Sequence, residues 1–550
     1  MKTCQTALFT LMLIGTIPLA LRAQTSSEYA NILAEYFSDD GPGATAIVTK
    51  GDEVLYRGAI GKANLELDVD MRPDHIFRIG SITKQFTAVA ILMLQEQGKL
   101  MVDDPITRFL PDYPTDGTTI TIEHLLTHTS GIQSYTDIHG WMATETRNDL
   151  TLEELIAVFR DLPMNFKPGE EWRYNNSGYI LLGAIIEAAS GMSYADFMQQ
   201  KVFDPLGMHS TAYDEQGRII PNRIPGYMPG PDGPRNADYL SMTLPHAAGA
   251  LISNVDDLAV WNRSLHAGKL VSKETLAAAF KPFNLNDGSD SGYGYGWQIN
   301  KVGPALSYEH GGGIHGFLTE GIYVPGHDVY VAVLSNCNCN PPGNAAIRMA
   351  ALATGHSYEI REISIDPQVL EEYVGVYDIE DSEDMRVITV EDGTVYSKRG
   401  SGPRQPTVPV GKDKFMYPAS FTSLEFVRDD KGAVIGQLVT PRSGRSGYAA
   451  KTEEEIVTRE SVDVAPDILA RYPGDYELMP GFILTIALED GALVGTATGQ
   501  GSVTMSAASE TTFFAENIGA EVEFVVNDAG ECEMLILRQG GQRIEGKRVK

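Results

Sequence analysis

Apolar and polar residues alternate near both ends of the first 350 residues of the chain. TAIVTKGDEVLYRGAIG (45–61) contains two alternating runs around a Lys50-Gly51-Asp52 turn, and GIYVPGHDVYVAVLSN (321–336) contains two more around Pro325-Gly326. A period of two interrupted by a glycine-containing turn is typical of a β-hairpin. The pattern therefore predicts one hairpin at each end of this region.

The hydrophobic period between the two hairpins is mostly that of helices. Thr151 and Glu154 have the spacing of a capping box, and further caps are expected at Ser177 and near Ser253. Strands at both ends with helices between them predict an α/β (α+β) domain, in which N- and C-terminal strands share one antiparallel sheet flanked by helices. The predicted helical segments are ITKQFTAVAILMLQEQGKL (82–100), TLEELIAVFRDL (151–162), SGYILLGAIIEAAS (177–190), SYADFMQQKVF (193–203) and SNVDDLAVWNRSLHAG (253–268).

After about residue 362 the pattern changes to short β-like runs separated by Gly, Asp and Pro, and it repeats. The segment 366–398 is echoed by 465–497, and LEFVRDDKGAVIGQLV (424–439) by VEFVVNDAGECEMLIL (522–537). The period of roughly 100 residues is far longer than that of a solenoid repeat. We therefore predict two copies of one small β-domain, each an antiparallel barrel that is closed or nearly closed.

The N-terminus has the features of a secretory signal peptide. Lys2 is followed by an apolar run from Ala7 to Leu19 and by a small-residue site at Leu21–Ala23. The run is too short for a convincing membrane span, although a membrane anchor is the alternative interpretation. The domains expected are a signal peptide (1–23), the α/β (α+β) domain (24–362) and two β-barrels (363–458 and 459–550), in an exported, periplasmic or secreted protein.

The net charge of the chain limits the classes of partner that it can bind. The 550 residues contain 43 Lys and Arg against 73 Asp and Glu, which gives a net charge of -30. Such a balance argues against nucleic acid as a partner, because phosphate contacts need clustered cations.

Three cysteines, Cys337, Cys339 and Cys532, remain in the mature chain. Without a second Cys/His cluster they are expected to be buried or paired structural cysteines, although the close pair is also compatible with a metal.

Ser81 and Lys84 lie at the start of a long apolar helix. Residues three apart on a helix share a face, so the Lys84 amine can meet the Ser81 hydroxyl. A serine hydroxyl needs a nearby base to act as a nucleophile, and a lysine serves as that base when its charge is suppressed or balanced. The non-catalytic alternative is that Ser81 caps the helix and Lys84 is exposed to solvent.

Two further segments can complete a site around Ser81. Tyr174 and Asn176 lie in a polar turn before a helix; a tyrosinate beside a lysine can accept the serine proton, and the asparagine amide can orient a carbonyl. His310 is followed by three glycines at a strand, where the backbone can approach a ligand and offer an N–H to an oxyanion together with that of Ser81. The alternatives are a buried tyrosine and a turn with a bulge.

The three motifs together, S-I-T-K (81–84), Y-N-N (174–176) and H-G-G (310–312), resemble the serine β-lactamase and penicillin-binding superfamily. They are similar in particular to its class C-like branch of exported esterases, D-aminopeptidases and D,D-peptidases, as are TIEHLLTHTSGI, FDPLGM and YGYGW. The resemblance covers about residues 30–350, and the two C-terminal copies resemble lipocalin-like barrels appended to some members. It implies catalysis by Ser81, Lys84 and Tyr174, with Asn176, His310, Gly312 and Gly313 binding the substrate.

His310 departs from the lysine that lactamases carry in the third motif. A mostly neutral histidine weakens recognition of a substrate carboxylate. The favoured function is therefore hydrolysis of small amides, peptides or esters in the manner of a D-aminopeptidase, with a short-chain esterase, a D,D-carboxypeptidase or a β-lactamase as alternatives. His315 and Glu309 flank this motif and are expected near the pocket.

Other functional classes receive less support. His124 and His128 are four residues apart, but Leu125 stands where a metalloprotease has glutamate, so no metal or cofactor is predicted. The chain lacks the G-x-S-x-G of an α/β-hydrolase. A non-enzymatic alternative is a secreted binding protein whose barrels hold an apolar ligand and whose hydrolase domain has decayed. The expected partner is a small molecule or short peptide substrate, with no membrane span in the mature protein.

Overall fold

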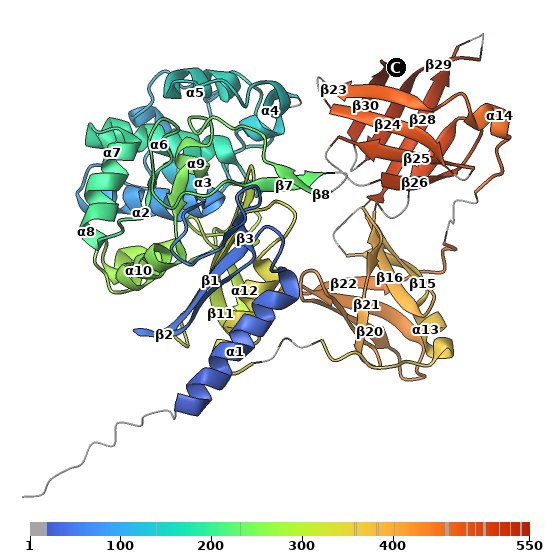
Figure 1. Ribbon diagram of the computed structural model, residues 1–550, viewed down its shortest axis with the longest axis horizontal. Coiled ribbons are helices and arrows are strands. Elements are labelled where there is room, and N and C mark those ends of the chain that lie inside the picture. The colour runs from blue at the N-terminus through green and yellow to red at the C-terminus, as the bar shows by residue number, and fades with distance from the viewer. Residues whose placement is uncertain are drawn as a thin grey trace, which may run out of the picture.

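The computed structural model places the predicted hydrolase domain, an open β-domain and a closed barrel one after the other along the chain (Figure 1). Most of the predicted signal peptide lies outside the described residues. The described residues are 19–550 except 139, 231–232, 357, 359, 381, 383, 401, 457–460, 480–481, 490, 499–501, 516–517, 528–529, 540–541 and 550.

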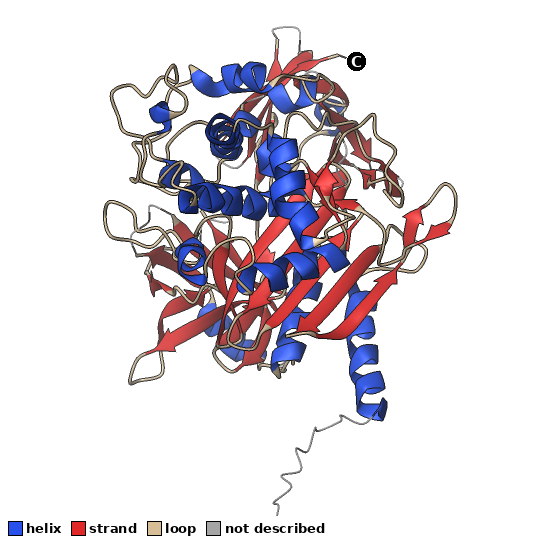
Figure 2. Ribbon diagram, turned by 90° about the vertical axis from the view of Figure 1, so that its left-hand side faces the viewer, coloured by secondary structure: helices blue, strands red, loops and turns tan. Residues whose placement is uncertain are grey.

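A six-stranded antiparallel sheet forms the centre of the first domain, in the order β10-β11-β12-β13-β1-β2. N-terminal strands thus share a sheet with strands from residues 298–335, as predicted, and both predicted hairpins are present. Figure 2 shows these strands with helices packed against them. The strands are β1 (Ala44–Lys50), β2 (Glu53–Ile60), β10 (Gln298–Val302), β11 (Ala305–Ile314), β12 (Phe317–Val324) and β13 (Val329–Ser335).

Both faces of this sheet are buried. In β13, Val331 and Val333 belong to a core shared with α1 (Leu19–Tyr36) and α12 (Gly343–Thr354), whereas Ala332 and Leu334 face the larger helical layer. Alternate residues of a strand point to opposite faces, which explains why this strand is apolar throughout. The sheet is therefore the middle layer between two sets of helices.

The larger helical layer is built around α2 (Thr83–Glu96) and α6 (Asn176–Ser190), which pack against each other. Thr151 and Glu154 form the predicted capping box of α5. The predicted cap at Ser177 is wrong, because the side chain of Asn175 caps α6 by accepting from the N–H of Gly178. The other helices are α3 (Ile122–Leu126), α4 (Trp141–Thr144), α5 (Leu152–Arg160), α7 (Tyr194–Phe197), α8 (Asp204–Leu206), α9 (His246–Gly249), α10 (Val255–His266) and α11 (Lys273–Ala279).

A small three-stranded sheet connects distant segments beside the helical layer. Its order is β5 (Phe77–Arg78), β9 (Leu251–Ser253) and β6 (Ala212–Tyr213), with all pairs antiparallel. These strands are too short for a period-of-two pattern to reveal them. Two two-stranded ribbons complete the domain, β3 (Lys62–Asn64) with β4 (Val69–Asp70) and β7 (Tyr227–Gly230) with β8 (Gly233–Asn236).

The two C-terminal copies form an open nine-stranded sheet, β14 to β22, and a closed eight-stranded barrel, β23 to β30, as the sequence predicted. The first follows α13 (Pro367–Tyr373) and the second α14 (Pro466–Leu469). The strands are β14 (Gly375–Ile379), β15 (Met385–Glu391), β16 (Thr394–Arg399), β17 (Gln405–Pro406), β18 (Val408–Gly411), β19 (Lys414–Tyr417), β20 (Thr422–Arg428), β21 (Val434–Thr440), β22 (Gly447–Lys451), β23 (Gly474–Met479), β24 (Phe482–Glu489), β25 (Ala492–Ala497), β26 (Ser502–Ala507), β27 (Thr512–Ala515), β28 (Ala520–Val526), β29 (Cys532–Gln539) and β30 (Gln542–Arg548).

Equivalent aromatic side chains stack in the same way in the two copies. Tyr373 stacks on Phe426 with ring centres 4.2 Å apart, and Tyr472 stacks on Phe524 at the same 4.2 Å. In the second copy these rings join a core of buried side chains that fills the barrel. An interior filled in this way does not fit the ligand-holding barrel of the non-enzymatic alternative.

Two further features concern cysteines and membranes. Cys337 and Cys339 form a disulfide in the loop after β13, and Cys532 is a buried free thiol. Within the described part of the chain no single helix is long and apolar enough to cross a membrane; one bent pair, Asn176–Ser190 with Tyr194–Leu206, passes on length and composition together.

Candidate active site

The turn that carries Ser81 is wedged between β5 and α2. Ser81 lies in a short 3-10 helix, Gly80–Ile82, that runs directly into α2. Gly80 has φ +51°, and a Cβ there would lie 2.9 Å from the backbone nitrogen of Gly313. Only glycine fits that conformation so close to another backbone. The nucleophile predicted from the sequence is thus pressed against the third motif.

Lys84 is fully buried beneath Ser81. Its Nζ lies 3.1 Å from Ser81 Oγ, 2.8 Å from Asn176 Oδ1 and 2.9 Å from the carbonyl oxygen of Ala248. Burial lowers the pKa of Lys84 well below its usual range, because a charged ammonium loses its hydration there. With Asn176 and Ala248 accepting the two protons of a neutral amine, its lone pair is left for the hydroxyl proton of Ser81.

Tyr174 hydrogen-bonds Ser81 from the other side, and the Nζ of Lys84 lies 4.8 Å from the centre of its ring. Burial raises the pKa of Tyr174, which disagrees with the tyrosinate expected from the sequence. That expectation assumed a charged lysine beside the ring, whereas burial disfavours the charged forms of both groups. The surroundings support a neutral Lys84 as base and a neutral Tyr174 as proton donor.

Asn176 is held in one orientation at the first turn of α6. Its Oδ1 accepts from Lys84 and its Nδ2 donates to Thr136 Oγ1 at 3.1 Å, while its backbone N–H donates to Ser134 Oγ at 3.1 Å. The sequence did not identify Ser134 or Thr136 as site residues. No periodic or spacing signal marks them, because they lie in and just before a 3-10 helix of only three residues, Tyr135–Asp137.

The glycines that follow His310 have different roles. Gly313 lines the same pocket as Ser81, and β10 pairs with β11 only as far as Glu309, so the edge of β11 beyond it has no partner in β10. Gly312 instead allows close packing, because a Cβ there would lie 2.1 Å from the carbonyl oxygen of Ile79. The N–H groups of Ser81 and Gly313 remain the predicted oxyanion donors.

His310 is buried behind the pocket rather than lining it. Its Nε2 lies 2.8 Å from the Tyr293 hydroxyl, and its Nδ1 lies 2.6 Å from the carbonyl oxygen of Gly311. Burial, aided by Lys84, lowers the pKa of His310 to about 3. The third motif therefore presents no fixed cation to a substrate.

The pocket beside Ser81 has a volume of about 130 Å³. Its walls are mostly apolar, and Asn176 and Thr136 provide polar groups near Ser81. His315 lies at its edge, as the sequence analysis anticipated. The apolar wall comprises Tyr135, Met142, Leu240, Leu244, Pro245, Ala248 and Ile314.

The histidines weighed as metal ligands have structural partners. His124 Nδ1 accepts from the N–H of Thr121 at 3.1 Å and completes the cap of α3. His128 Nδ1 accepts from the N–H of Asn175 at 3.1 Å, and the ring lies against Tyr174 with centres 4.4 Å apart. Within the described residues, no group of three or more His, Cys, Asp or Glu is placed to hold a metal ion.

A serine beside a buried lysine, next to a strand edge that β10 leaves unpaired, is the arrangement of an acyl-transferring serine hydrolase. Residues 30–355 match the family described as Beta-lactamase, and the chain belongs to that family. Residues 458–548, the second β-domain, match a domain of unknown function, DUF3471.

Relatives and a solved structure agree with this assignment. The chain is 31% identical over 419 residues to Penicillin-binding protein 4* of Bacillus subtilis (strain 168), covering 71% of this chain and 91% of that protein. It is 28% identical over 335 residues to the D-aminopeptidase of Gluconobacter oxydans (strain 621H), covering 60% of this chain and 62% of that protein. The crystal structure of a D-stereospecific amidohydrolase from Streptomyces sp. is similar with a TM-score of 0.52 and 27% identity, over 59% of this chain and 97% of that one.

Proposed function

We propose that this protein is an exported serine hydrolase that cleaves small amides, peptides or esters through an acyl-enzyme on Ser81, most nearly in the manner of a D-aminopeptidase. The observation that carries the proposal is the buried Lys84 amine, 3.1 Å from Ser81 Oγ. In the first step Ser81 Oγ attacks the substrate carbonyl while its proton passes to Lys84. Tyr174 then gives its proton to the leaving group as the carbonyl–leaving-group bond breaks, and takes the proton that Lys84 received, so that both residues are neutral again. Water releases the acyl group by the reverse sequence: it gives a proton to this pair, attacks the carbonyl, and Ser81 leaves with a proton returned to its Oγ.

The pocket supports a preference for an acyl group with a small side chain and no carboxylate next to the scissile bond. A volume of about 130 Å³ with apolar walls suits a side chain such as that of alanine, and His310 offers no charge for a nearby carboxylate. The D-aminopeptidase and the D-stereospecific amidohydrolase to which the chain is similar act, by their names, on related substrates. Export is supported by the N-terminal sequence and by the Cys337–Cys339 disulfide, since disulfides persist in oxidising compartments.

The test is turnover of a substrate panel by the purified full-length protein, with Ser81→Ala as the matched control. The panel consists of D- and L-alanyl p-nitroanilides, p-nitrophenyl acetate and nitrocefin. We expect D-alanyl p-nitroanilide or the ester to be turned over faster than nitrocefin, and a fluorophosphonate adduct to map to Ser81. Labelling of another serine with Ser81 unmodified, or faster turnover of nitrocefin than of every other compound, would contradict the proposal.

A further inference from the structure

A second pocket, of about 320 Å³, adjoins the one beside Ser81. The two pockets share Leu240 and His315 in their walls, so a molecule that extends past these side chains enters both. Arg78 and Arg223 line the second pocket and do not line the first. Two cationic side chains therefore line the pocket next to the one that contains the nucleophile, in a protein that is acidic overall.

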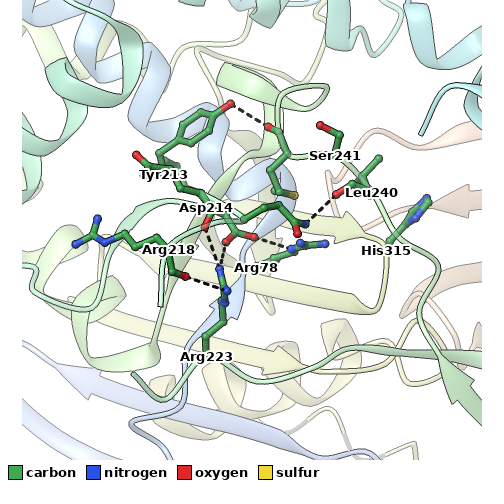
Figure 3. Close-up of polar contacts among 12 residues, drawn as sticks. Arg78, Tyr213, Asp214, Arg218, Arg223, Leu240, Ser241 and His315 are labelled. Atoms are coloured by element: carbon green, nitrogen blue, oxygen red, sulfur yellow. Dashed lines mark hydrogen bonds and ion pairs between the residues drawn. The ribbon is translucent and has the colours of Figure 1, made fainter. Parts of the chain in front are cut away.

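These two arginines share a single carboxylate. Asp214 is completely buried; its Oδ2 accepts from Arg78 Nε at 2.8 Å and its Oδ1 from Arg223 Nη1 at 2.7 Å. Figure 3 shows both guanidinium groups converging on Asp214, with Leu240 and His315 beside them. Two positive charges against one negative charge leave one positive charge unbalanced.

That excess charge is available on Arg78. Arg223 also donates to the carbonyl oxygens of Glu215 and Arg218, at 3.3 and 3.2 Å. Arg78 uses only its Nε, and its two terminal nitrogens have no hydrogen-bond partner among the described residues. A guanidinium with its terminal N–H groups free is suited to bind a carboxylate with two parallel hydrogen bonds.

Nearby acidic groups do not cancel this charge. Asp238 is paired with Arg235 through two hydrogen bonds, of 2.9 and 2.8 Å. Glu66 does not line the pocket, and its carboxylate accepts from the side-chain amide of Asn236. Gln216, whose amide donates to the carbonyl oxygen of Leu240 at 3.4 Å, adds a polar group to the wall.

We propose that this second pocket is a subsite for a carboxylate carried by the substrate, with Arg78 as its cation. The inference rests on the proposed function, because it assumes that the same substrate acylates Ser81. Arg78 lies on β5, three residues before Ser81, yet outside the Ser81 pocket. The carboxylate recognised is therefore at least one residue away from the scissile carbonyl, unlike the carboxylate of a β-lactam. The substrate class is a short peptide or acyl amide with a distal free carboxylate.

His315 lines both pockets and has one ring nitrogen without a described hydrogen-bond partner. Its Nδ1 lies 3.2 Å from the carbonyl oxygen of Asp238, which leaves Nε2 for a ligand. Burial lowers the pKa of His315, and Arg78 lowers it further against the opposing effect of Asp238. A carboxylate bound at Arg78 would favour the protonated ring, which could then donate to it.

The experiment compares substrates that differ only in the distal carboxylate. D-Alanyl-glycyl-glycine and its C-terminal amide place the charge on the leaving-group side; N-succinyl- and N-acetyl-D-alanyl p-nitroanilide place it on the acyl side. We expect one of these pairs to show a kcat/KM about 10- to 100-fold higher for the carboxylate, the range for a hydrogen-bonded charge. If the amides and acetyl compounds are turned over but neither pair shows a preference, the subsite is wrong and the proposed function stands. If none of the four is turned over while p-nitrophenyl acetate is, the subsite is wrong and the proposed function stands. If p-nitrophenyl acetate and the alanyl anilides are not turned over either, both fail.

Two sets of variants assign the effect to this pocket, with the charged-to-uncharged ratio measured within each variant. Arg78→Met should reduce the ratio to about one. Because that change leaves Asp214 with one partner, a second pair avoids it: Tyr239, 41% exposed at the pocket wall, is replaced by Glu or by Gln. Tyr239→Glu should abolish the preference by competing for Arg78, and Tyr239→Gln should retain it. A preference that survives in both Arg78→Met and Tyr239→Glu would overturn the proposal.

Discussion

Arg442 of the first β-domain forms a buried ion pair with Glu309, the residue before His310 in β11. Arg442 Nη1 lies 3.0 Å from Glu309 Oε2, Nη2 donates to Oε1, and Nε donates to the carbonyl oxygen of Lys301 at 3.1 Å. The side chains are 11% and 4% exposed. The loop between β21 and β22 therefore supports, from behind, the strand that borders the Ser81 pocket.

Arg442→Met should destabilise the protein by about 3 kcal/mol, because it leaves the Glu309 carboxylate buried and unpaired. The matched double variant Arg442→Met/Glu309→Gln removes the unpaired charge and should recover most of that loss. Urea denaturation of the full chain gives both values. A double variant no more stable than Arg442→Met would show that the unpaired Glu309 carboxylate is not the cause of the loss.

Glu320 predicts how stability changes with pH. Burial, with repulsion from Glu309 and against the attraction of Arg442, raises its pKa from an ordinary value near 4.5 to about 8. Between these two values the folded state holds a proton that the unfolded state releases. The contribution of Glu320 to the free energy of unfolding is therefore fully present below about pH 4.5 and is lost as the pH rises to 8. We expect Glu320→Gln to be more stable than wild type at pH 8.5 but not at pH 5. The difference should be on the order of 2 kcal/mol, since partial exposure reduces the effect of the shift.

Urea midpoints at pH 5, 6.5 and 8.5 for wild type and Glu320→Gln provide the measurement. Carboxylates remote from Glu320 contribute alike to both proteins, so the difference between the two curves reports Glu320 together with its interaction with Glu309. Parallel curves would mean that Glu320 titrates normally in the folded protein.

Tyr174→Phe should lower kcat about 100-fold or more with KM near the wild-type value, because the hydroxyl acts on proton transfer and does not line the pocket. Tyr179→Phe is the matched control: its ring centre is 5.3 Å from Lys84 Nζ, but its hydroxyl donates to the carbonyl oxygen of Leu126. That control should keep kcat within a few-fold. The losses from Lys84→Met and Tyr174→Phe should not add, since the two residues act on one proton. An equal loss of kcat in the Tyr174→Phe and Tyr179→Phe variants would mean that Tyr174 has only a packing role.

The sequence predicted the shared sheet, the repeated β-domains and the meeting of Ser81 with Lys84, because each rests on periodicity or on local helix spacing. Asn176, 92 residues from Lys84, was placed with them only by the resemblance of the three motifs to a known family. The sequence did not predict that His310 faces away from the pocket, because the face presented by a strand edge depends on what packs behind it, here Tyr293. The ionisation of Tyr174 and Lys84 depends on burial, which spacing does not reveal. Arg78 and Asp214 are brought together by strands of two and three residues, and Arg442 by a domain contact across 133 residues of sequence.

The Cys337–Cys339 disulfide encloses Asn338, whose side chain holds the β11–β12 turn. Asn338 Oδ1 accepts from the N–H of Gly316 at 2.6 Å, and its Nδ2 donates to the carbonyl oxygen of Ile314 at 3.1 Å. This turn carries His315, which lies in the walls of both pockets. The disulfide thus fixes the residue that positions one side of the site.

Replacing both cysteines by alanine should lower kcat/KM several-fold through a looser turn, at a stability cost of only about 1–2 kcal/mol, because a disulfide closing so short a loop constrains the unfolded chain little. Asn338→Ala, which keeps the disulfide and removes the hydrogen bonds, should lower kcat/KM by a similar factor. The two changes together should then cost little more than either alone, since they act on the same turn. Steady-state kinetics on D-alanyl p-nitroanilide, with Cys532→Ala as the control for general thiol effects, make the comparison. Full additivity of the two losses would show that the disulfide and Asn338 act independently.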